Sequence, residues 1–257
     1  MISLMHRLGS HLVLCCMVLL VGCAVESVTP PPTTTSNPAS NWQIQLGTSI
    51  TSPPTLAFPL HGAMQVQGSQ VTGVFSGTPL CGEPQVLNFA GTIDSMGNLT
   101  IASKPAYFVV QLAVPADPTV VSNGTMGVTG QFCALAMAPA PAVGVEVAPL
   151  TGTFTGPVTS SGSNGNFSMT LTQSGTPNAS GQFPLTGSVT FSSGVCVEST
   201  LAPMSGTVSG VGMTLATQNI SVVASTNPAA TQLSATSIVF PPGSCANGTY
   251  TGTLTRQ

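Results

Sequence analysis

Charged residues are scarce in this chain of 257 residues. Only three Lys or Arg and six Asp or Glu occur, so charged side chains make up 4% of the sequence. An ordinary globular protein has about 25%. Neutralising the phosphates of a nucleic acid needs clustered Lys or Arg, and only Lys104 and Arg256 occur beyond residue 30. This scarcity excludes nucleic acid as a partner.

Residues that commonly carry catalysis or bind metals are also few. His61 is the one histidine beyond residue 30, and the chain has one Trp and two Tyr. Neither Gly-x-Ser-x-Gly nor Cys-x-x-Cys spacing occurs, which removes the usual signals of a serine hydrolase and of a zinc site. No cluster of Asp and Asn has the spacing of a calcium loop. We therefore expect no metal and no cofactor.

The N-terminal segment has the three parts of an export signal. A short polar start containing Arg7 precedes the apolar stretch Leu12–Val21, and small residues then lead to Cys23. About ten apolar residues are too few to cross a bilayer, which needs roughly 20. The tetrapeptide Leu20–Cys23 (Leu-Val-Gly-Cys) resembles the lipobox of bacterial lipoproteins.

This resemblance implies that a lipoprotein signal peptidase removes residues 1–22. Cys23 would then be the N-terminus and would carry a diacylglyceryl group and an amide-linked acyl chain such as palmitate. Two or more acyl chains make membrane attachment stable. In Gram-negative lipoproteins an Asp after the cysteine marks retention at the inner membrane, whereas this chain has Ala24. We expect a lipid-anchored envelope protein at the outer membrane; an ordinary secretory signal is the alternative.

Residues 23–40 are rich in Pro and Thr and contain no apolar periodicity. Prolines keep such a segment extended at up to about 3 Å per residue, and its polar residues have no core to join. We predict a tether that separates the membrane anchor from a folded region.

The folded region has the periodicity of β-strands. Apolar side chains occupy alternate positions at Trp42, Ile44 and Leu46, and short runs of this kind are separated by Gly, Pro and Asn. Disorder is excluded because 42% of the residues are hydrophobic. The sequence predicts an all-β protein, an antiparallel sandwich or barrel, with Trp42, Phe58 and Phe183 in the core.

Residues 41–156 and 157–257 form two predicted repeats. An offset of 125 aligns Asn41 with Asn166 and also Phe58 with Phe183, and the offset then drops by ten where Cys81 meets Cys196. This drop predicts a hairpin-sized insertion in the first copy, and residues 138–149 have no counterpart in the second. The motif at residues 152–156 matches that at residues 248–252, so we place both at the ends of their copies. The two copies could form two small domains or two halves of one larger sheet system, and the sequence does not distinguish these alternatives.

Four cysteines follow Cys23, which suits disulfides in an exported chain: Cys81, Cys133, Cys196 and Cys245. Four cysteines allow three connectivities. The duplication favours pairing Cys81 with Cys133 and Cys196 with Cys245, so that each copy has one bridge. A loop of about 50 residues gives roughly 4 kcal/mol in the chain-entropy model.

Carboxylates offer the only further catalytic candidates. A glycosidase needs two of them facing across a sugar, and the chain provides Glu83, Asp94, Asp117, Glu146 and Glu198. Glu83 and Glu198 occupy equivalent repeat positions, which favours a structural role beside each bridge. His61 precedes Gly62 in a predicted turn, and we predict an exposed histidine at the end of a strand. Convergence of Glu83, Glu198, Asp94 and His61 in one cleft would favour an enzyme, and scattered positions a binding module.

The sequence thus favours a non-catalytic, structural or binding β region that is anchored to the membrane by its lipid. Its many hydroxyl groups and few charges suit a surface that faces envelope polysaccharide or other envelope proteins. The alternative is an envelope hydrolase that acts on glycan or ester substrates.

Overall fold

A computed structural model of the chain describes residues 37–50, 59–77, 85–128, 137–160, 163–193, 196–200 and 203–257, with the backbone alone at residues 235 and 236. Residues 36–257 form one compact unit. The described residues form strands and turns, which confirms the predicted all-β class. None of their segments is a helix of the length and apolarity that a membrane span requires.

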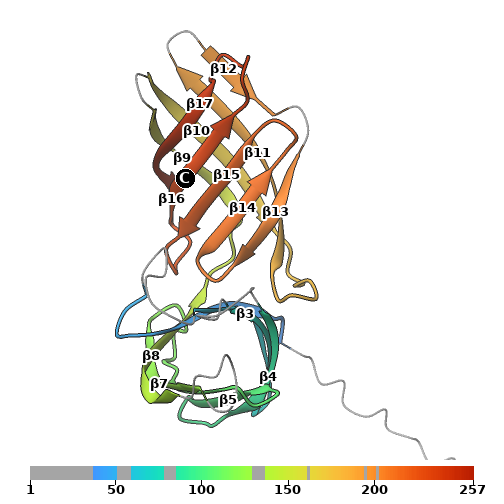
Figure 1. Ribbon diagram of the computed structural model, residues 1–257, viewed down its shortest axis with the longest axis vertical. Coiled ribbons are helices and arrows are strands. Elements are labelled where there is room, and N and C mark those ends of the chain that lie inside the picture. Colours follow the sequence, from blue (N-terminus) through green and yellow to red (C-terminus); the bar gives the residue numbers. More distant parts are fainter. Residues whose placement is uncertain are drawn as a thin grey trace, which may run out of the picture. The chain divides into compact units, whose positions relative to one another are not determined.

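The first eight strands form a closed antiparallel barrel in which each strand pairs with the next along the chain (Figure 1). The barrel closes where β8 pairs with β1. The strands are β1 (Ser40–Leu46), β2 (Leu60–Gln67), β3 (Gln70–Gly77), β4 (Gln85–Ile93), β5 (Asn98–Lys104), β6 (Phe108–Ala113), β7 (Ser122–Val128) and β8 (Met137–Val147).

The remaining strands form a second antiparallel sheet in the order β10-β9-β17-β16-β15-β14-β13-β11-β12. A further pairing of β10 with β11 closes this sheet into a second barrel. Strand β12 pairs with residues 190–193 of β11, beyond the stretch 183–187 that pairs with β13. Its strands are β9 (Gly152–Ser160), β10 (Ser163–Gln173), β11 (Phe183–Ser193), β12 (Cys196–Ser199), β13 (Met204–Ser209), β14 (Gly212–Ala216), β15 (Ser221–Thr226), β16 (Gln232–Phe240) and β17 (Gly248–Arg256).

The alternation of apolar and polar residues, seen most clearly in strands such as β14, explains why these segments form barrels with apolar interiors. In β14, Met213 and Leu215 are buried while Thr214 between them is exposed. Successive side chains of a strand point to opposite faces, so apolar residues fill the barrel and Thr or Ser covers its outside. In the second barrel the rings of Phe191 and Tyr250 pack with centroids 4.9 Å apart. The predicted core positions Trp42 and Phe183 are buried, and Phe58 lies outside the described residues.

The change from one barrel to the next falls at a different place from the predicted repeat boundary. Residues 152–156 lie in β9, which pairs with β10 and β17 of the second barrel. The two matched motifs are therefore in neighbouring strands of one sheet, and the division lies between Val147 and Gly152. Two barrels in tandem are consistent with an internal duplication. In the first barrel, β3 occupies the stretch where the sequence predicts an insertion.

Candidate binding site

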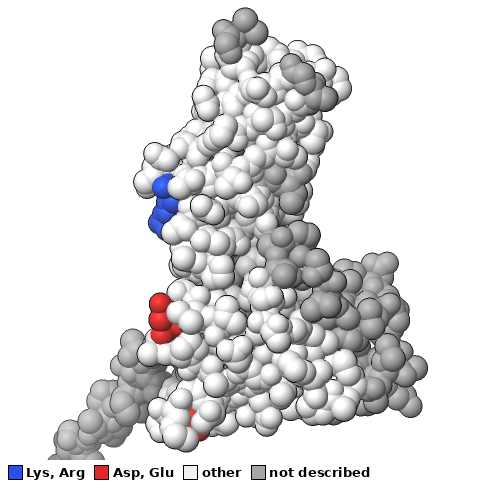
Figure 2. Space-filling model, turned by 90° about the vertical axis from the view of Figure 1, so that its left-hand side faces the viewer, with Lys and Arg blue, Asp and Glu red and all other residues white. Residues whose placement is uncertain are grey.

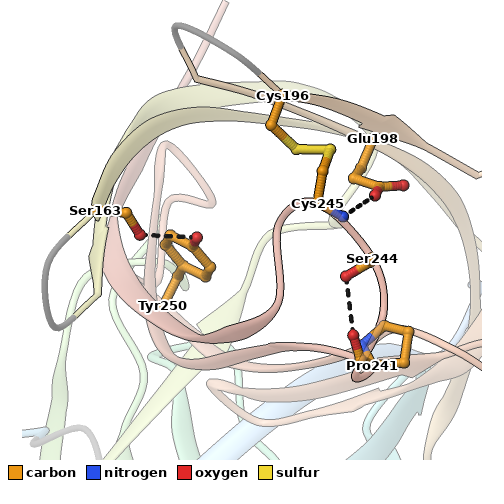
Figure 3. The surroundings of a disulfide bond; sticks show 7 residues. All are labelled: Ser163, Cys196, Glu198, Pro241, Ser244, Cys245 and Tyr250. Carbon is orange, nitrogen blue, oxygen red and sulfur yellow. Dashed lines mark hydrogen bonds between the residues drawn. A yellow bond between two sulfur atoms is a disulfide. The ribbon is translucent and has the colours of Figure 1, made fainter.

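A disulfide joins β12 to the loop between β16 and β17. Cys196 begins β12, Cys245 lies in the loop, and their Cα atoms are 5.6 Å apart (Figure 3). This bond confirms the second of the two predicted pairings. Cys81 and Cys133, like Cys23, lie outside the described residues.

Glu198 holds the same loop through a hydrogen bond. The backbone N–H of Cys245 donates to its Oε1 over 2.8 Å (Figure 3). Cys196, Cys245 and Glu198 place one potential ligand atom each within 4.8 Å of one another, but both sulfur atoms are bonded in the disulfide. The predicted role of Glu198 beside the bridge is thereby confirmed, and its repeat partner Glu83 lies outside the described residues.

His61 is the second residue of β2, which agrees with the predicted strand end, but it is half-buried and not exposed as predicted. Its Nδ1 lies 2.8 Å from the Oγ of Ser209, at the end of β13. Burial lowers the pKa of His61 from its ordinary value, because the charged imidazolium loses its hydration. The histidine thus takes part in a contact between the two barrels.

Two buried amides of β1 also belong to this contact. The sequence analysis did not predict this role for them. Asn41 binds the turn after β13 twice: its Nδ2 donates to the Gly210 carbonyl over 2.9 Å, and the Gly210 N–H donates to its Oδ1 over 2.7 Å. The N–H of Val211 donates to Gln43 Oε1 over 3.4 Å. Alternation places Asn41 and Gln43 on the face opposite Trp42, and the turn buries that face too.

Two carboxylates stabilise exposed turns. Asp94 accepts the backbone N–H groups of Met96 and Asn98 and the side-chain amide of Asn98. Asp117 accepts the N–H and the hydroxyl of Thr119. The side-chain bonds from Asn98 and Thr119, respectively, are the main reason why the pKa of each carboxyl lies below its ordinary value.

The pKa of Glu146 on β8 is shifted in the opposite direction. Its pKa is raised, chiefly by burial, and the negative charge of Asp117 adds to this effect. The side chain lines a hollow of about 560 Å³ together with Ser40, Gln173 and Phe183. No other carboxylate of the described residues lines this hollow, so the geometry lacks the facing pair that a glycosidase needs.

The larger hollow of about 760 Å³, which we call the β12 groove, lies beside the disulfide. Its walls are formed by β12, the turn between β14 and β15, and the loop between β16 and β17. Glu198, Gln218, Asn219 and Ser244 contribute polar groups, and Phe240 is among its apolar residues. This volume is within the roughly 300–1,000 Å³ typical of ligand sites.

The described candidates for catalysis therefore have separate partners. Glu198 lines the β12 groove, which contains neither His61 nor Asp94. His61 contacts Ser209, and Asp94 binds the turn between β4 and β5. The arrangement brings together hydrogen-bonding groups in the groove. It does not bring the described acid and base candidates, His61, Asp94 and Glu198, to one cleft.

Comparisons with protein-family models, with curated proteins and with solved structures found no match.

Proposed function

We propose that this chain is a lipid-anchored protein of the bacterial cell envelope whose β-barrels have a non-catalytic binding role. The lipobox-like tetrapeptide ending at Cys23 supports the anchor, and the Pro/Thr-rich segment that follows supports a tethered display of the barrels. The outer membrane is the expected destination because Ala24 follows the cysteine.

The observation that carries the binding role is the separation of the titratable side chains. His61, Asp94 and Glu198 each form hydrogen bonds with different partners in different parts of the fold. General acid–base catalysis needs such groups around one reacting centre. This distribution gives the alternative, an envelope hydrolase, less support.

The character of the surface agrees with a neutral partner. Figure 2 shows a face of the protein on which Lys, Arg, Asp and Glu occupy only a few small spots. Exposed positions of the strands are occupied instead by hydroxyl side chains such as Thr170, Thr172 and Thr186. Such a surface offers hydrogen bonds without long-range charge, which suits envelope polysaccharide or the uncharged faces of envelope proteins.

The anchor is tested by the intact, unreduced mass of the protein extracted from the membranes of its host. We expect the mass of a chain that begins at Cys23, plus a diacylglyceryl and an acyl group, less four hydrogens for two disulfides. The Cys23→Ala variant should lose the lipid and its membrane association. A lipid-free wild-type mass, or a variant that remains in the outer-membrane fraction, would contradict the proposal.

A further inference from the structure

We infer that the β12 groove is a binding site for a neutral oligosaccharide. The inference deepens the proposed binding role and rests on it only for the source of the ligand, since the envelope would supply the saccharide.

The charge of the groove excludes an anionic ligand. Glu198 is the one charged residue among those that line it. The two Lys and Arg residues of the described chain are elsewhere: Lys104 ends β5, and Arg256 donates from β17 to the Thr151 carbonyl. A phosphate or carboxylate ligand would meet a negative charge with no compensating cation.

The polar groups of the groove match the hydroxyl groups of a sugar. Gln218 and Asn219 are exposed, and their side chains make no hydrogen bond within the described part of the chain. Each primary amide offers both a donor and an acceptor, while the Glu198 carboxylate offers acceptors only. A hydroxyl group donates one hydrogen bond and accepts others, so adjacent sugar hydroxyls can be satisfied by an amide and a carboxylate together.

Both polar walls are held in place before a ligand arrives. On one side, the Thr217 hydroxyl accepts the N–H groups of Asn219 and Ile220, each over 3.1 Å, and fixes the turn that carries the amides. On the other side, the disulfide and the bond from Cys245 N–H to Glu198 fix the carboxylate. Because the backbone of both walls is already ordered, the conformational entropy lost on binding is that of the exposed side chains.

The apolar lining offers packing without an exposed aromatic face. Phe240 is 3% exposed because its ring packs against Phe191 and Tyr250, with centroids 5.2 Å and 5.8 Å away. Hydrogen bonds must therefore supply most of the affinity. We expect a dissociation constant between about 10 μM and 1 mM, the weak range of small hydrogen-bonded ligands.

The test uses the full protein as it is extracted from its host, in a detergent without a sugar headgroup. Maltotetraose, cellotetraose, chitotetraose and mannotetraose are titrated in turn, with tetragalacturonate as the anionic comparison, and binding is followed by saturation-transfer NMR. At least one neutral tetrasaccharide should bind, and tetragalacturonate should bind at least about 10-fold more weakly.

Two variants locate the site. Asn219→Ala removes an amide that has no hydrogen-bond partner among the described residues, so it should weaken binding at least about 5-fold while leaving the unfolding temperature unchanged. Glu198→Gln keeps a carbonyl oxygen for the Cys245 N–H and removes the charge, with a loss of at least about 10-fold. Asn123→Ala, at an exposed position of β7, is the matched control and should bind like the wild type.

Three results would overturn the inference: no binding of any neutral tetrasaccharide up to about 10 mM, tetragalacturonate binding as tightly as the neutral sugars, or equal effects of Asn219→Ala and Asn123→Ala. None of them concerns the lipid, whereas failure of the proposed anchor would appear in the mass and fractionation of the protein. The two failures are therefore distinguishable.

Discussion

Gly210 lies in the contact between the barrels, where there is no room for a side chain. It has φ of +54°, and a Cβ added there would lie 2.1 Å from Gln43 Oε1 and 2.9 Å from the Cβ of His61. An alanine would be strained by its backbone conformation and would also push Gln43 and His61 away. We predict that Gly210→Ala lowers the free energy of unfolding by about 2–4 kcal/mol, measured by urea titration.

Gly68→Ala separates the two causes of this loss. Gly68 has φ of +61°, similar to Gly210, but no atom lies within 4 Å of an added Cβ. Its substitution should cost only about 1 kcal/mol, the contribution of the backbone conformation alone. Equal losses in the two variants would show that Gly210 is required for its conformation and not for the close contact.

The burial of His61 predicts a pH dependence of stability. The pKa of its imidazole is lowered below its ordinary value of 6.5 in the folded protein, so the unfolded chain binds the proton more readily. Stability that is present above pH 6.5 is therefore lost as the pH falls below this value, towards the folded-state pKa. His61→Gln, which cannot titrate, should flatten the plot of urea midpoint against pH below pH 6.5. An unchanged slope in this variant would assign the pH dependence to other groups.

At the scale of the elements, the strands could be predicted from the sequence. A barrel wall with one buried face produces an alternation of apolar and polar residues along each strand. Strand β1 shows the limit of this reasoning. Trp42 and Ile44 are buried as predicted, but Asn41 and Gln43 on the opposite face are buried as well. Their partners, Gly210 and Val211, lie far away in the sequence, and alternation carries no information about such a contact.

The division between the barrels differs from the predicted repeat boundary for a similar reason. Sequence similarity relates residues 152–156 to residues 248–252, but similarity alone does not determine with which strands a segment pairs. Strand β9 pairs with β17, and this long-range pairing places it in the second barrel. The candidate site was predictable in part: the Cys196–Cys245 bridge and Glu198 follow from the repeat, whereas Asn219 enters the groove only because the turn between β14 and β15 lies near β12.

The disulfide should contribute strongly to the second barrel. It closes a loop with a sequence separation of 49, for which the chain-entropy model gives about 4 kcal/mol. The double variant Cys196→Ala, Cys245→Ala should lose stability of this order in urea unfolding and should also loosen the loop that Glu198 binds. A loss below about 1 kcal/mol would mean that the unfolded chain gains little freedom when the bridge is removed.

At the scale of the whole molecule, the contact between the barrels has an apolar part as well as a polar one. Ala63 of β2 belongs to the buried cluster that fills the second barrel. Val145 and Val147 of β8 form a further cluster with Val211, next to the turn that Asn41 binds. Unfolding either barrel would expose these residues and would leave the buried amides of β1 without partners, which costs free energy in the other barrel.

This coupling predicts that the two barrels unfold together. Calorimetry of the wild type should show one transition, with the calorimetric enthalpy about equal to the van't Hoff enthalpy. Asn41→Ala leaves the Gly210 N–H and carbonyl buried without their partner, which should cost about 2–3 kcal/mol and broaden or split the transition. Asn123→Ala, at an exposed position of β7, should leave the single transition unchanged. Two resolved transitions in the wild type would mean that the interactions within each barrel outweigh those that join them, and that each barrel is an independent folding unit.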